Sequence, residues 1–405
     1  MIFRILKVST GDGPSTGFFF SRGLFTVLIV MVGAFGFMLA ALVQHLWPAP
    51  ETPTPVTRFP DTYTARFPAT TAVPPPPARE VPASISASLS SLLHENAFES
   101  VLTEVGSLSA SYPGSRIPLL YRIQALVQLG RHSEAEQNIR EALRAYPSDP
   151  ETLIIGASYY HAIRNPLAAE KMLLRALKAD PNRVGAMRGL VTTYLQAGLW
   201  RLAKEIGINS LHKFPADPVL TLGTADAARL LGEHAEAANR YQEYLRLQPH
   251  SRPDVHFSLA TSLRESGAES NTVCEQYQKA LSLQASHVPT LNDYALFLAT
   301  KGRTQEAISL VPALLKHSAT ATIALDTAGL VHLKARQVAQ AEMFFRQALA
   351  GEPHNPIIAA HLAALCHQQA DQSKADEWLS RAKAECKGDQ VEWKRALGEY
   401  ESHKP

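Results

Sequence analysis

The sequence predicts an all-α protein in which an array of paired helices follows a membrane-spanning helix and a proline-rich linker. Three observations support this prediction: a 34-residue period covers most of the chain, a long uncharged run lies near the N-terminus, and 11 of the 27 prolines fall between Pro48 and Pro82. The 405 residues suffice for one long repeat array or for two or three ordinary domains. With a net charge of +2 and no strongly basic stretch, nucleic acid is not an expected partner.

The uncharged run reads LFTVLIVMVGAFGFMLAALV, from Leu24 to Val43. At about 1.5 Å per residue, a helix of this length spans a hydrocarbon core of about 30 Å. A cleaved signal peptide is the alternative, but its apolar core is usually about 7–15 residues long and ends at a small-residue cleavage site. Here the core is longer and QHLWPAP follows it. We therefore expect residues 24–47 to form an uncleaved transmembrane helix, with Trp47 at the membrane interface and residues 1–23 before it.

Positive charges set the orientation of such a helix, because Lys and Arg are retained on the cytoplasmic side. Arg4, Lys7 and Arg22 precede the helix, whereas only Arg58 follows it closely. We expect a single-pass protein of the inner membrane, with a cytoplasmic N-terminus and the rest of the chain exported to the periplasm.

The transmembrane helix also has small residues on one face, at Gly33, Gly36 and Ala40. Such residues let two membrane helices approach closely, which favours a weak homodimer through this helix. Glycine is common in membrane spans in general, so a monomer is the alternative.

Residues 48–84 form the predicted linker. They contain PAPETPTPV and TTAVPPPPAREVP and little that could form a core. Such sequence favours the extended polyproline-II conformation, which gives a stiff spacer with a reach on the order of 100 Å. We interpret the segment as a tether. A docking strip for a proline-binding groove is the alternative, and no specific residue pattern supports it.

The repeat period is set by prolines at the ends of predicted helices. Five of them recur at one constant spacing: Pro113, Pro147, Pro181, Pro215 and Pro249. A small residue keeps the same phase at Ala135, Ala169, Ala203, Ala237, Ala307, Ala341 and Ala375. Between Ala237 and Ala307 the spacing is two periods plus two residues, which places a two-residue insertion around RESGAESNTVCEQ.

Each period has the features of two helices joined by a turn. A second small residue follows the first by seven positions, at Ala142, Ala176, Ser210, Ala280, Ala348 and Ala382. Two small residues seven apart lie on one helix face and let a neighbouring helix pack closely. A turn glycine comes before them at Gly130, Gly198, Gly232, Gly267 and Gly302. Glycine therefore ends the first helix of each pair, and proline ends the second.

This pattern resembles the tetratricopeptide repeat (TPR). The fullest match, ALDTAGLVHLKARQVAQAEMFFRQALAGEPHNP, supplies Leu325, Gly329, Ala341, Phe345, Ala348 and Pro353, with Arg336 where the family usually has glycine. The resemblance implies a superhelical solenoid of about 8–9 helix-turn-helix repeats whose first helices line a concave groove. It covers residues 85–389, with clear repeats in 116–389 and a degenerate first repeat in 85–115. Residues 390–405 then form a polar capping helix.

The sequence offers no catalytic, cofactor or metal site. GPSTG at 13–17 matches the G-x-S-x-G nucleophile elbow, but that motif needs a strand before it and a helix after it. The three cysteines, Cys274, Cys366 and Cys386, contain no C-x-x-C pair, and the 15 histidines have no ligand spacing. We therefore expect a non-enzyme without cofactors whose cysteines are buried apolar residues. A disulfide is the alternative in an exported domain.

The TPR resemblance also implies which residues face the groove. The carried-over positions are Gln124, Gln128, His161, Arg188, Gln196, Asp226, Arg229, Arg264, Asn292, Asp326 and Lys334, with Phe257 as one aromatic. The candidate protein-binding residues among them are Arg188, Gln196, Asp226, Arg229, Phe257, Arg264, Asn292 and Asp326. Four of the charged residues in this set, Arg188, Asp226, Arg229 and Arg264, lie on consecutive first helices of the middle repeats, about 184–300. We therefore expect these repeats to bind most strongly, with a preference for acidic partner segments.

These features predict a non-catalytic, membrane-anchored scaffold for protein partners of a cell-envelope assembly. Secretion, pilus, polysaccharide-export and envelope-growth machineries use such parts in the family. The alternative is a periplasmic carrier or chaperone that holds extended segments of exported proteins. A contiguous apolar stripe along the groove would favour the carrier, and the mixed polar lining argues against it.

Overall fold

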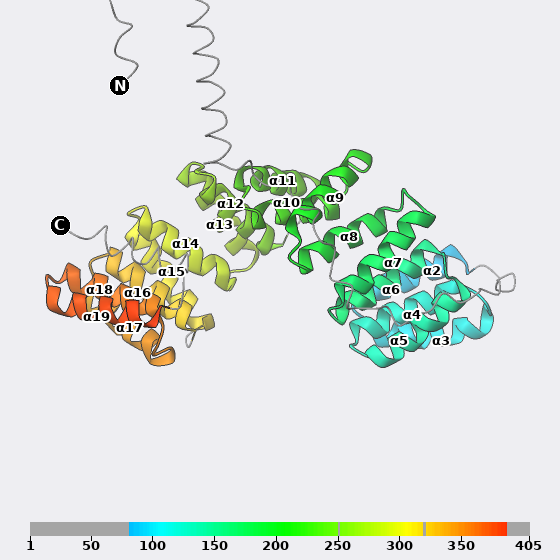
Figure 1. Cartoon of the computed structure of the whole chain (residues 1–405), viewed down its shortest axis with the longest axis horizontal. Coiled ribbons are helices and arrows are strands. Elements are labelled where there is room, and N and C mark those ends of the chain that lie inside the picture. Colours follow the sequence, from blue (N-terminus) through cyan, green and yellow to red (C-terminus); the bar gives the residue numbers. More distant parts are fainter. Residues whose placement is uncertain (1–80, 250–251, 319–320, 387–405) are drawn as a thin grey trace, which may run out of the picture. The chain divides into compact units, whose positions relative to one another are not determined.

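The computed structural model describes residues 81–249, 252–318 and 321–386. Within these ranges the chain forms 18 α-helices and no strand, arranged as nine consecutive pairs (Figure 1). The predicted all-α array of helix pairs is confirmed. The predicted transmembrane helix at 24–47 and the predicted cap at 390–405 lie outside the described residues, as does the linker up to residue 80. None of the described helices is both long and apolar enough to cross a membrane.

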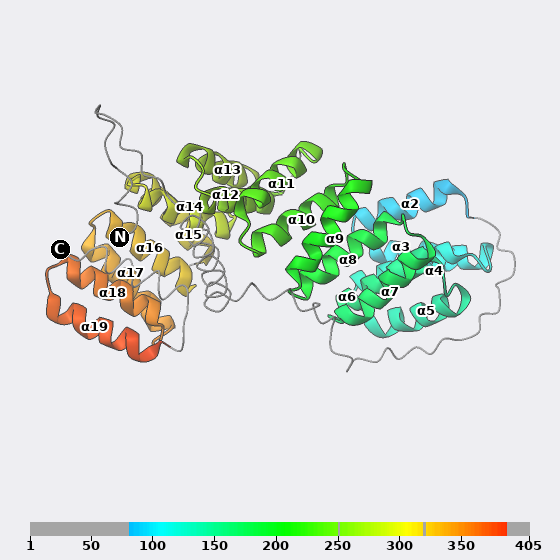
Figure 2. The ribbon, with the colours of Figure 1, turned by 45° about the horizontal axis from the view of Figure 1, so that its top comes forward.

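Each pair has a first and a second helix, which pack against each other as α18 and α19 do in Figure 2. The first helices are α2 (Ala83–His94), α4 (Arg116–Gln128), α6 (Pro150–Ala162), α8 (Val184–Gln196), α10 (Pro218–Leu230), α12 (Pro253–Glu265), α14 (Val288–Thr300), α16 (Thr322–Lys334) and α18 (Pro356–Gln368). The second helices are α3 (Phe98–Ser111), α5 (His132–Ala145), α7 (Pro166–Ala179), α9 (Trp200–Lys213), α11 (His234–Leu247), α13 (Ser270–Leu283), α15 (Thr304–Ser318), α17 (Val338–Gly351) and α19 (Gln372–Glu385).

The turn inside each pair uses one residue in the left-handed backbone region. The predicted glycines occupy this position: Gly130, Gly198, Gly232, Gly267 and Gly302 have φ between 71° and 79°. In four other pairs the residue is Asn96, Arg164, Arg336 or Ala370, with φ between 55° and 59°. A side chain with a Cβ is strained in this region by roughly 1–2 kcal/mol, and asparagine tolerates it best. The arginines and the alanine therefore store a small strain that glycine would remove.

The predicted small residues lie where helices meet. Seven alanines of the first series are 0% exposed: Ala135, Ala169, Ala203, Ala237, Ala307, Ala341 and Ala375. The second series is equally buried at Ala142, Ala176, Ala280, Ala348 and Ala382, and nearly so at Ser210. The apolar faces of consecutive pairs therefore join, and one core cluster extends from Leu120 on α4 to Ala227 on α10. One helix pair cannot bury this surface alone, which explains why the chain repeats it.

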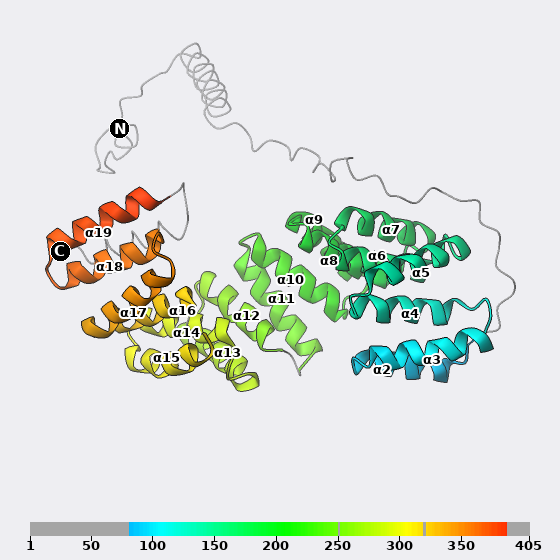
Figure 3. The same cartoon turned by 90° about the horizontal axis from the view of Figure 1, so that it is seen from below.

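The row of first helices changes at α12. Successive first helices from α2 to α10 contact each other, as do α14, α16 and α18, and Figure 3 shows α4 between α2 and α6. Among the described helices, α12 has no comparable contact with α10 or α14. The helices α10, α12 and α14 start at Pro218, Pro253 and Val288, so α12 and α14 each start one residue later than the regular period would place them after the previous first helix. The predicted two-residue insertion is therefore split, with one extra residue before α12 and one between α12 and α13.

Candidate functional site

The candidate residues all lie on first helices. Arg188 and Gln196 are on α8, Asp226 and Arg229 on α10, Phe257 and Arg264 on α12, Asn292 on α14 and Asp326 on α16. Gln196 is exposed and the other seven are partly buried. The hydrogen bonds and ion pairs that each side chain forms within the chain therefore determine which of its polar groups remain available to a partner.

Arg188 joins α8 to the next first helix. Its Nε donates to Asp217 Oδ2 at 2.9 Å, and its Nη2 donates to the same oxygen. Asp217 is the N-cap of α10, where its other carboxylate oxygen accepts the Leu220 amide at 3.0 Å. The Asp217 side chain is 6% exposed and that of Arg188 is 40% exposed. The arginine therefore neutralises a buried carboxylate and keeps part of its guanidinium at the surface.

Asp226 and Arg229, both on α10, form hydrogen bonds with the same tyrosine hydroxyl. Tyr241, fully buried on α11, donates its hydroxyl to Asp226 Oδ1 at 2.5 Å, and Arg229 Nε donates to the Tyr241 oxygen at 3.2 Å. Burial raises the pKa of the Asp226 carboxyl, although the Tyr241 hydrogen bond and the nearby Arg229 act in the opposite direction. Burial likewise raises the pKa of Tyr241. The structure thus brings these two candidates together, but in a network internal to the chain.

Long side chains bridge α12 and α14 across their wider spacing. Arg264 pairs with Glu265 at 2.9 Å and reaches Asp293 on α14 at 3.6 Å. Its Nη1 also lies 3.4 Å from the Tyr277 hydroxyl oxygen. Phe257 packs with its ring centroid 5.8 Å from that of His287, the N-cap of α14. These side-chain contacts connect α12 and α14, which pack less closely against each other than most of the other neighbouring first helices do.

Asn292 and Asp326 differ in how well they are bonded. The Asn292 Oδ1 is buried and accepts no hydrogen bond from the described part of the chain. Its Nδ2 makes a long contact of 3.4 Å with Asp293. Asp326 lies 2.7 Å from Nδ1 of His361, which is buried on α18 and packs against the Phe345 ring. Asp326 therefore joins α16 to α18, whereas Asn292 keeps an unused acceptor.

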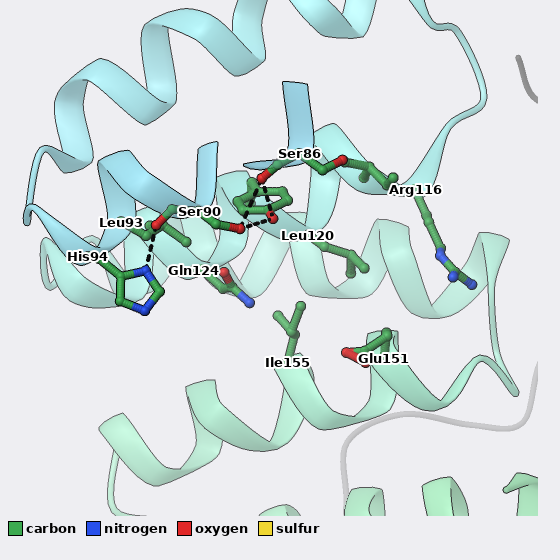
Figure 4. A pocket seen from close by; sticks show the side chains of 11 residues that line it. Ser86, Ser90, Leu93, His94, Arg116, Leu120, Gln124, Glu151 and Ile155 are labelled. Carbon is green, nitrogen blue, oxygen red and sulfur yellow. Dashed lines mark hydrogen bonds between the residues drawn. The ribbon is translucent and has the colours of Figure 1, made fainter. Parts of the chain in front are cut away.

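A pocket of about 440 Å³ lies between α2, α4 and α6, at the N-terminal end of the array (Figure 4). Leu93, Ile117, Leu120 and Ile155 supply its apolar lining. Figure 4 shows the side chains of Leu120 and Ile155 gathered between the helices with Gln124 beside them. The combination of aliphatic surface and a few polar groups is typical of a ligand-binding pocket.

The polar groups of this pocket come from all three helices. The hydroxyls of Ser90 and Tyr121 lie 2.6 Å apart, and both reach the Ser86 carbonyl oxygen, at 2.9 and 3.0 Å. On the rim, Arg116 forms an ion pair with Asp149 at the N-cap of α6, and Glu151 forms one with Arg183 at the N-cap of α8. The rim therefore has a cation on α4 followed by an anion on α6.

A second pocket, also of about 440 Å³, includes the candidate Gln196. It is lined by His161, Ala162, Arg164, Pro166 and Gln196, beside the turn between α6 and α7. His161 contacts the buried Thr193 hydroxyl through Nε2 at 2.5 Å. Burial lowers the pKa of this histidine, so its neutral form is favoured.

Comparisons with known proteins agree with this arrangement. A tetratricopeptide repeat family profile matches residues 118–158, and no curated protein sequence matches the chain. A solved tetratricopeptide repeat protein from Parabacteroides merdae ATCC 43184 is similar, with 15% identity and a TM-score of 0.50, over 62% of this chain and 98% of that one. The APC/C hetero-tetramer Cut9–Hcn1 is similar, with 16% identity and a TM-score of 0.51, over 74% of this chain and 56% of that one. At such identities the likeness to solved structures shows the fold alone.

The chain therefore has a fold similar to that of tetratricopeptide-repeat proteins, and its residues 118–158 match the profile of that family. TPR folds serve as scaffolds for protein–protein interaction and are generally non-catalytic. In the residues that the structure describes, no group of three or more His, Cys, Asp or Glu side chains is placed to hold a metal ion. Cys274 and Cys366 are buried free thiols.

Sequence reasoning missed the pocket between α2, α4 and α6, which lies before the middle repeats at 184–300. Gln124 is one of the groove positions that the TPR resemblance implies, but the sequence predicts the strongest binding for the charged residues of the middle repeats. The available signal was the pair of serines at 86 and 90, on the face of α2 that lines the pocket. Small side chains at these two positions leave space that larger ones would fill.

Proposed function

We propose that this TPR protein is a non-catalytic scaffold that binds an extended segment of a protein partner along its first helices. The main anchor point is the pocket between α2, α4 and α6. The observation that carries the proposal is the lining of that pocket, in which Leu93, Leu120 and Ile155 are combined with polar groups such as Gln124. A buried apolar anchor supplies most of the binding energy at interfaces of this kind, while polar groups fix orientation.

The charged candidates of the middle repeats add to this surface through the parts of them that stay exposed. Arg188 is 40% exposed and Arg264 is 25% exposed, although both are paired within the chain. Three arginines against one aspartate on α8, α10 and α12 support a preference for acidic partner segments.

We also propose that residues 24–47 anchor the scaffold in the inner membrane and that the array lies in the periplasm. There it serves an envelope assembly, such as a secretion, pilus, polysaccharide-export or envelope-growth machinery. The support is in the sequence: the run from Leu24 to Val43 has no charge, and Arg4, Lys7 and Arg22 precede it. A reporter active only in the exported compartment should be active when fused after Pro405. The protein should also stay in the membrane pellet after a high-salt wash, and a soluble product that begins near Trp47 would contradict the anchor.

Photocrosslinking in native membranes tests the binding surface. A photoreactive residue in place of Gln124, in the pocket, should capture a partner protein. The same residue in place of Lys171, which is exposed on the second helix α7, should not. Leu93→Glu, which places a charge in the pocket, should reduce capture at position 124 at least tenfold while the helical circular dichroism signal is kept. Capture from position 171 alone would move the binding surface to the second helices.

A further inference from the structure

The second pocket, at the C-terminal ends of α6 and α8, has a positive charge and no acidic side chain in its lining. We call it the turn pocket, and its lining residues are His161, Ala162, Arg164, Pro166 and Gln196. Arg164 is exposed, and its guanidinium forms no ion pair or hydrogen bond with the residues that the structure describes. Arg188 on α8, by contrast, is paired with Asp217. The turn pocket therefore offers an uncompensated cation to a ligand.

His161 adds a hydrogen-bond acceptor to the turn pocket. Thr193 donates its hydroxyl to the Gly189 carbonyl oxygen at 2.7 Å, so the Thr193 oxygen accepts from Nε2 of His161, 2.5 Å away. Burial lowers the pKa of His161 and favours the neutral ring, which has a single N–H. Because that N–H is on Nε2, Nδ1 is an acceptor, and no group of the described chain donates to it. Gln196, which is exposed, supplies a further donor and acceptor.

The C-terminus of α6 also lies at the turn pocket, and its carbonyl groups oppose the binding of an anion. Three of these carbonyls, on Tyr159, Tyr160 and His161, already accept amides of the turn at distances between 2.8 and 3.1 Å. A helix C-terminus carries about half a negative charge, whereas the Arg164 guanidinium carries a full positive charge. The guanidinium also matches a carboxylate with two parallel hydrogen bonds. The charge balance of the turn pocket therefore favours a carboxylate.

One face of α6 connects the turn pocket with the pocket between α2, α4 and α6. Glu151 and Ile155 line the pocket between the three helices (Figure 4), and Ala162 lines the turn pocket. Together with Ser158 they occupy positions i, i+4, i+7 and i+11, which share one helix face. Ser158 is exposed, and its hydroxyl donates to the Ile155 carbonyl oxygen at 2.8 Å. Between the two pockets, this face thus carries a short side chain that leaves room for a peptide backbone.

The distance between the two pockets sets the spacing of side chains in a ligand. Ala162 follows Ile155 by two helical turns, which is about 10–11 Å along the helix axis. An extended peptide advances about 3.3 Å per residue, so about three residues cover this distance. Arg164 comes just after Ala162 and has a long side chain, which allows a fourth residue. A segment with one side chain in the pocket between α2, α4 and α6 thus brings its third or fourth following residue to the turn pocket.

We propose that the array recognises a partner segment in which a large apolar residue and an aspartate or glutamate are three or four positions apart. The apolar side chain enters the pocket between α2, α4 and α6, and the carboxylate pairs with Arg164 in the turn pocket. A backbone amide beside the acidic residue donates to Nδ1 of His161. The inference rests on the proposed function, because it names the chemistry of the segment that binds there. It adds Arg164, which is not among the groove positions that the TPR resemblance implies.

The first test is selection of short random peptides, displayed on phage, against the full-length protein in nanodiscs. Selected peptides should carry an apolar and an acidic residue three or four positions apart. With Arg164→Glu, lysine or arginine should replace the acidic residue at the same spacing. Arg201→Glu changes an exposed arginine outside the turn pocket and should leave the selected pattern unaltered. Selection of the same acidic pattern by Arg164→Glu, or of no such pair by the unaltered chain, would overturn the inference.

The second test measures the affinity of one selected peptide, made with a fluorescent label. Arg164→Gly should raise the melting temperature, because glycine removes the strain of a φ of 55°. Weaker binding by this variant therefore cannot come from unfolding. It should bind the peptide about five- to tenfold more weakly, as expected for a partly exposed arginine–carboxylate pair. Replacing the acidic residue of the peptide by its amide should weaken binding to the unaltered chain equally, but should not weaken binding to Arg164→Gly further. Independent, additive losses would show that the carboxylate binds elsewhere.

The two proposals fail in different ways. If Leu93→Glu abolishes binding of the selected peptides and Arg164→Gly leaves it unchanged, the inference is wrong and the proposed function stands. If Arg164→Gly weakens binding and Leu93→Glu does not, the pocket between α2, α4 and α6 is not the anchor. The proposed function is then wrong in its main point, while the carboxylate contact stands. Capture of a partner at position 124 in native membranes provides a reading of the proposed function that does not depend on Arg164.

Discussion

The glycines inside the first helices give a matched test of packing in the array. Gly156 on α6 and Gly329 on α16 are both helical, and alanine at either position gains up to about 1 kcal/mol of helix propensity. A Cβ at Gly156 would meet only Cγ2 of Ile139, at 3.9 Å, which is an ordinary contact. Gly156→Ala should therefore stabilise its pair by about 0.5–1 kcal/mol.

At Gly329 the same methyl group meets an aromatic ring. A Cβ there would press on Cε1 of Phe345 and lie 2.5 Å from its Cδ1 and 3.0 Å from its Cζ. Phe345 is 0% exposed, so the ring has no free space to enter. Overpacking of this kind costs about 1–3 kcal/mol, which outweighs the helix propensity. Gly329→Ala should therefore destabilise its pair by up to about 2 kcal/mol.

Hydrogen exchange followed by mass spectrometry is the suitable assay, because repeat arrays can unfold in parts and a single midpoint would mix them. Peptides from α16 and α17 should exchange up to about 30-fold faster in Gly329→Ala, since about 1.4 kcal/mol is a tenfold change. Peptides from α6 and α7 should exchange more slowly in Gly156→Ala. If both variants slow exchange alike, the Phe345 ring moves at no cost and the packing argument is refuted.

Four further predictions follow from burial, backbone strain and charge. Ala341→Phe should destabilise α16 and α17 by about 1–3 kcal/mol or more in denaturant unfolding, whereas Ala335→Ser in the turn should cost under about 0.5 kcal/mol. Arg336→Gly should raise the melting temperature by relieving about 1 kcal/mol of left-handed strain. Because burial lowers the folded pKa of His161, stability should be lost as pH falls below about 6.5, and melting curves at pH 7.5 and 5.5 should differ less in His161→Gln. Because burial raises the folded pKa of Asp226 above its ordinary value of 3.8, stability falls as pH rises through the folded pKa. Asp226→Asn should therefore melt higher than the unaltered chain at pH 7.5, and the gap should close near pH 3.5, whereas a lower melting temperature at pH 7.5 would show that the nearby arginine outweighs burial.

Local chemistry explains why most of the array was predictable. A turn that needs positive φ selects glycine, and a close helix crossing selects alanine, so both recur with the period of the structure. Arg336 shows the limit of this logic, because the structure places it in the same left-handed turn as the glycines. The split insertion around α12 was not predictable. A two-residue excess in the period does not say which of two neighbouring loops contains each residue.

The candidate site was less predictable. A groove position indicates where a side chain lies, but it does not indicate which other residue of the same chain forms a hydrogen bond or an ion pair with that side chain. Arg188 is a groove residue by position, yet part of its role is to neutralise Asp217 at the N-cap of the next helix. That partner lies 29 residues away, outside the list of groove positions. The pocket at α2, α4 and α6 depends on the short side chains of Ser86 and Ser90 on α2. Two serines on one helix are a weak sequence signal for a space between helices.

One position in the second helices explains why the two ends of the candidate surface differ. It carries Ile139, Leu173, Tyr241, Tyr277 and Phe345 in five pairs, and all five side chains are buried. A tyrosine there extends its hydroxyl to the first-helix face, where Tyr241 bonds an aspartate and an arginine of α10 and Tyr277 lies beside an arginine of α12. Isoleucine and leucine at this position offer no hydroxyl, so the first helices α4 and α6 gain apolar support without a polar network. The two tyrosines thus tie Asp226, Arg229 and Arg264 into internal contacts, whereas the aliphatic side chains at the same position in the N-terminal pairs leave α4 and α6 with an apolar lining. This difference is the physical reason to place the anchor at the N-terminal end rather than among the arginines.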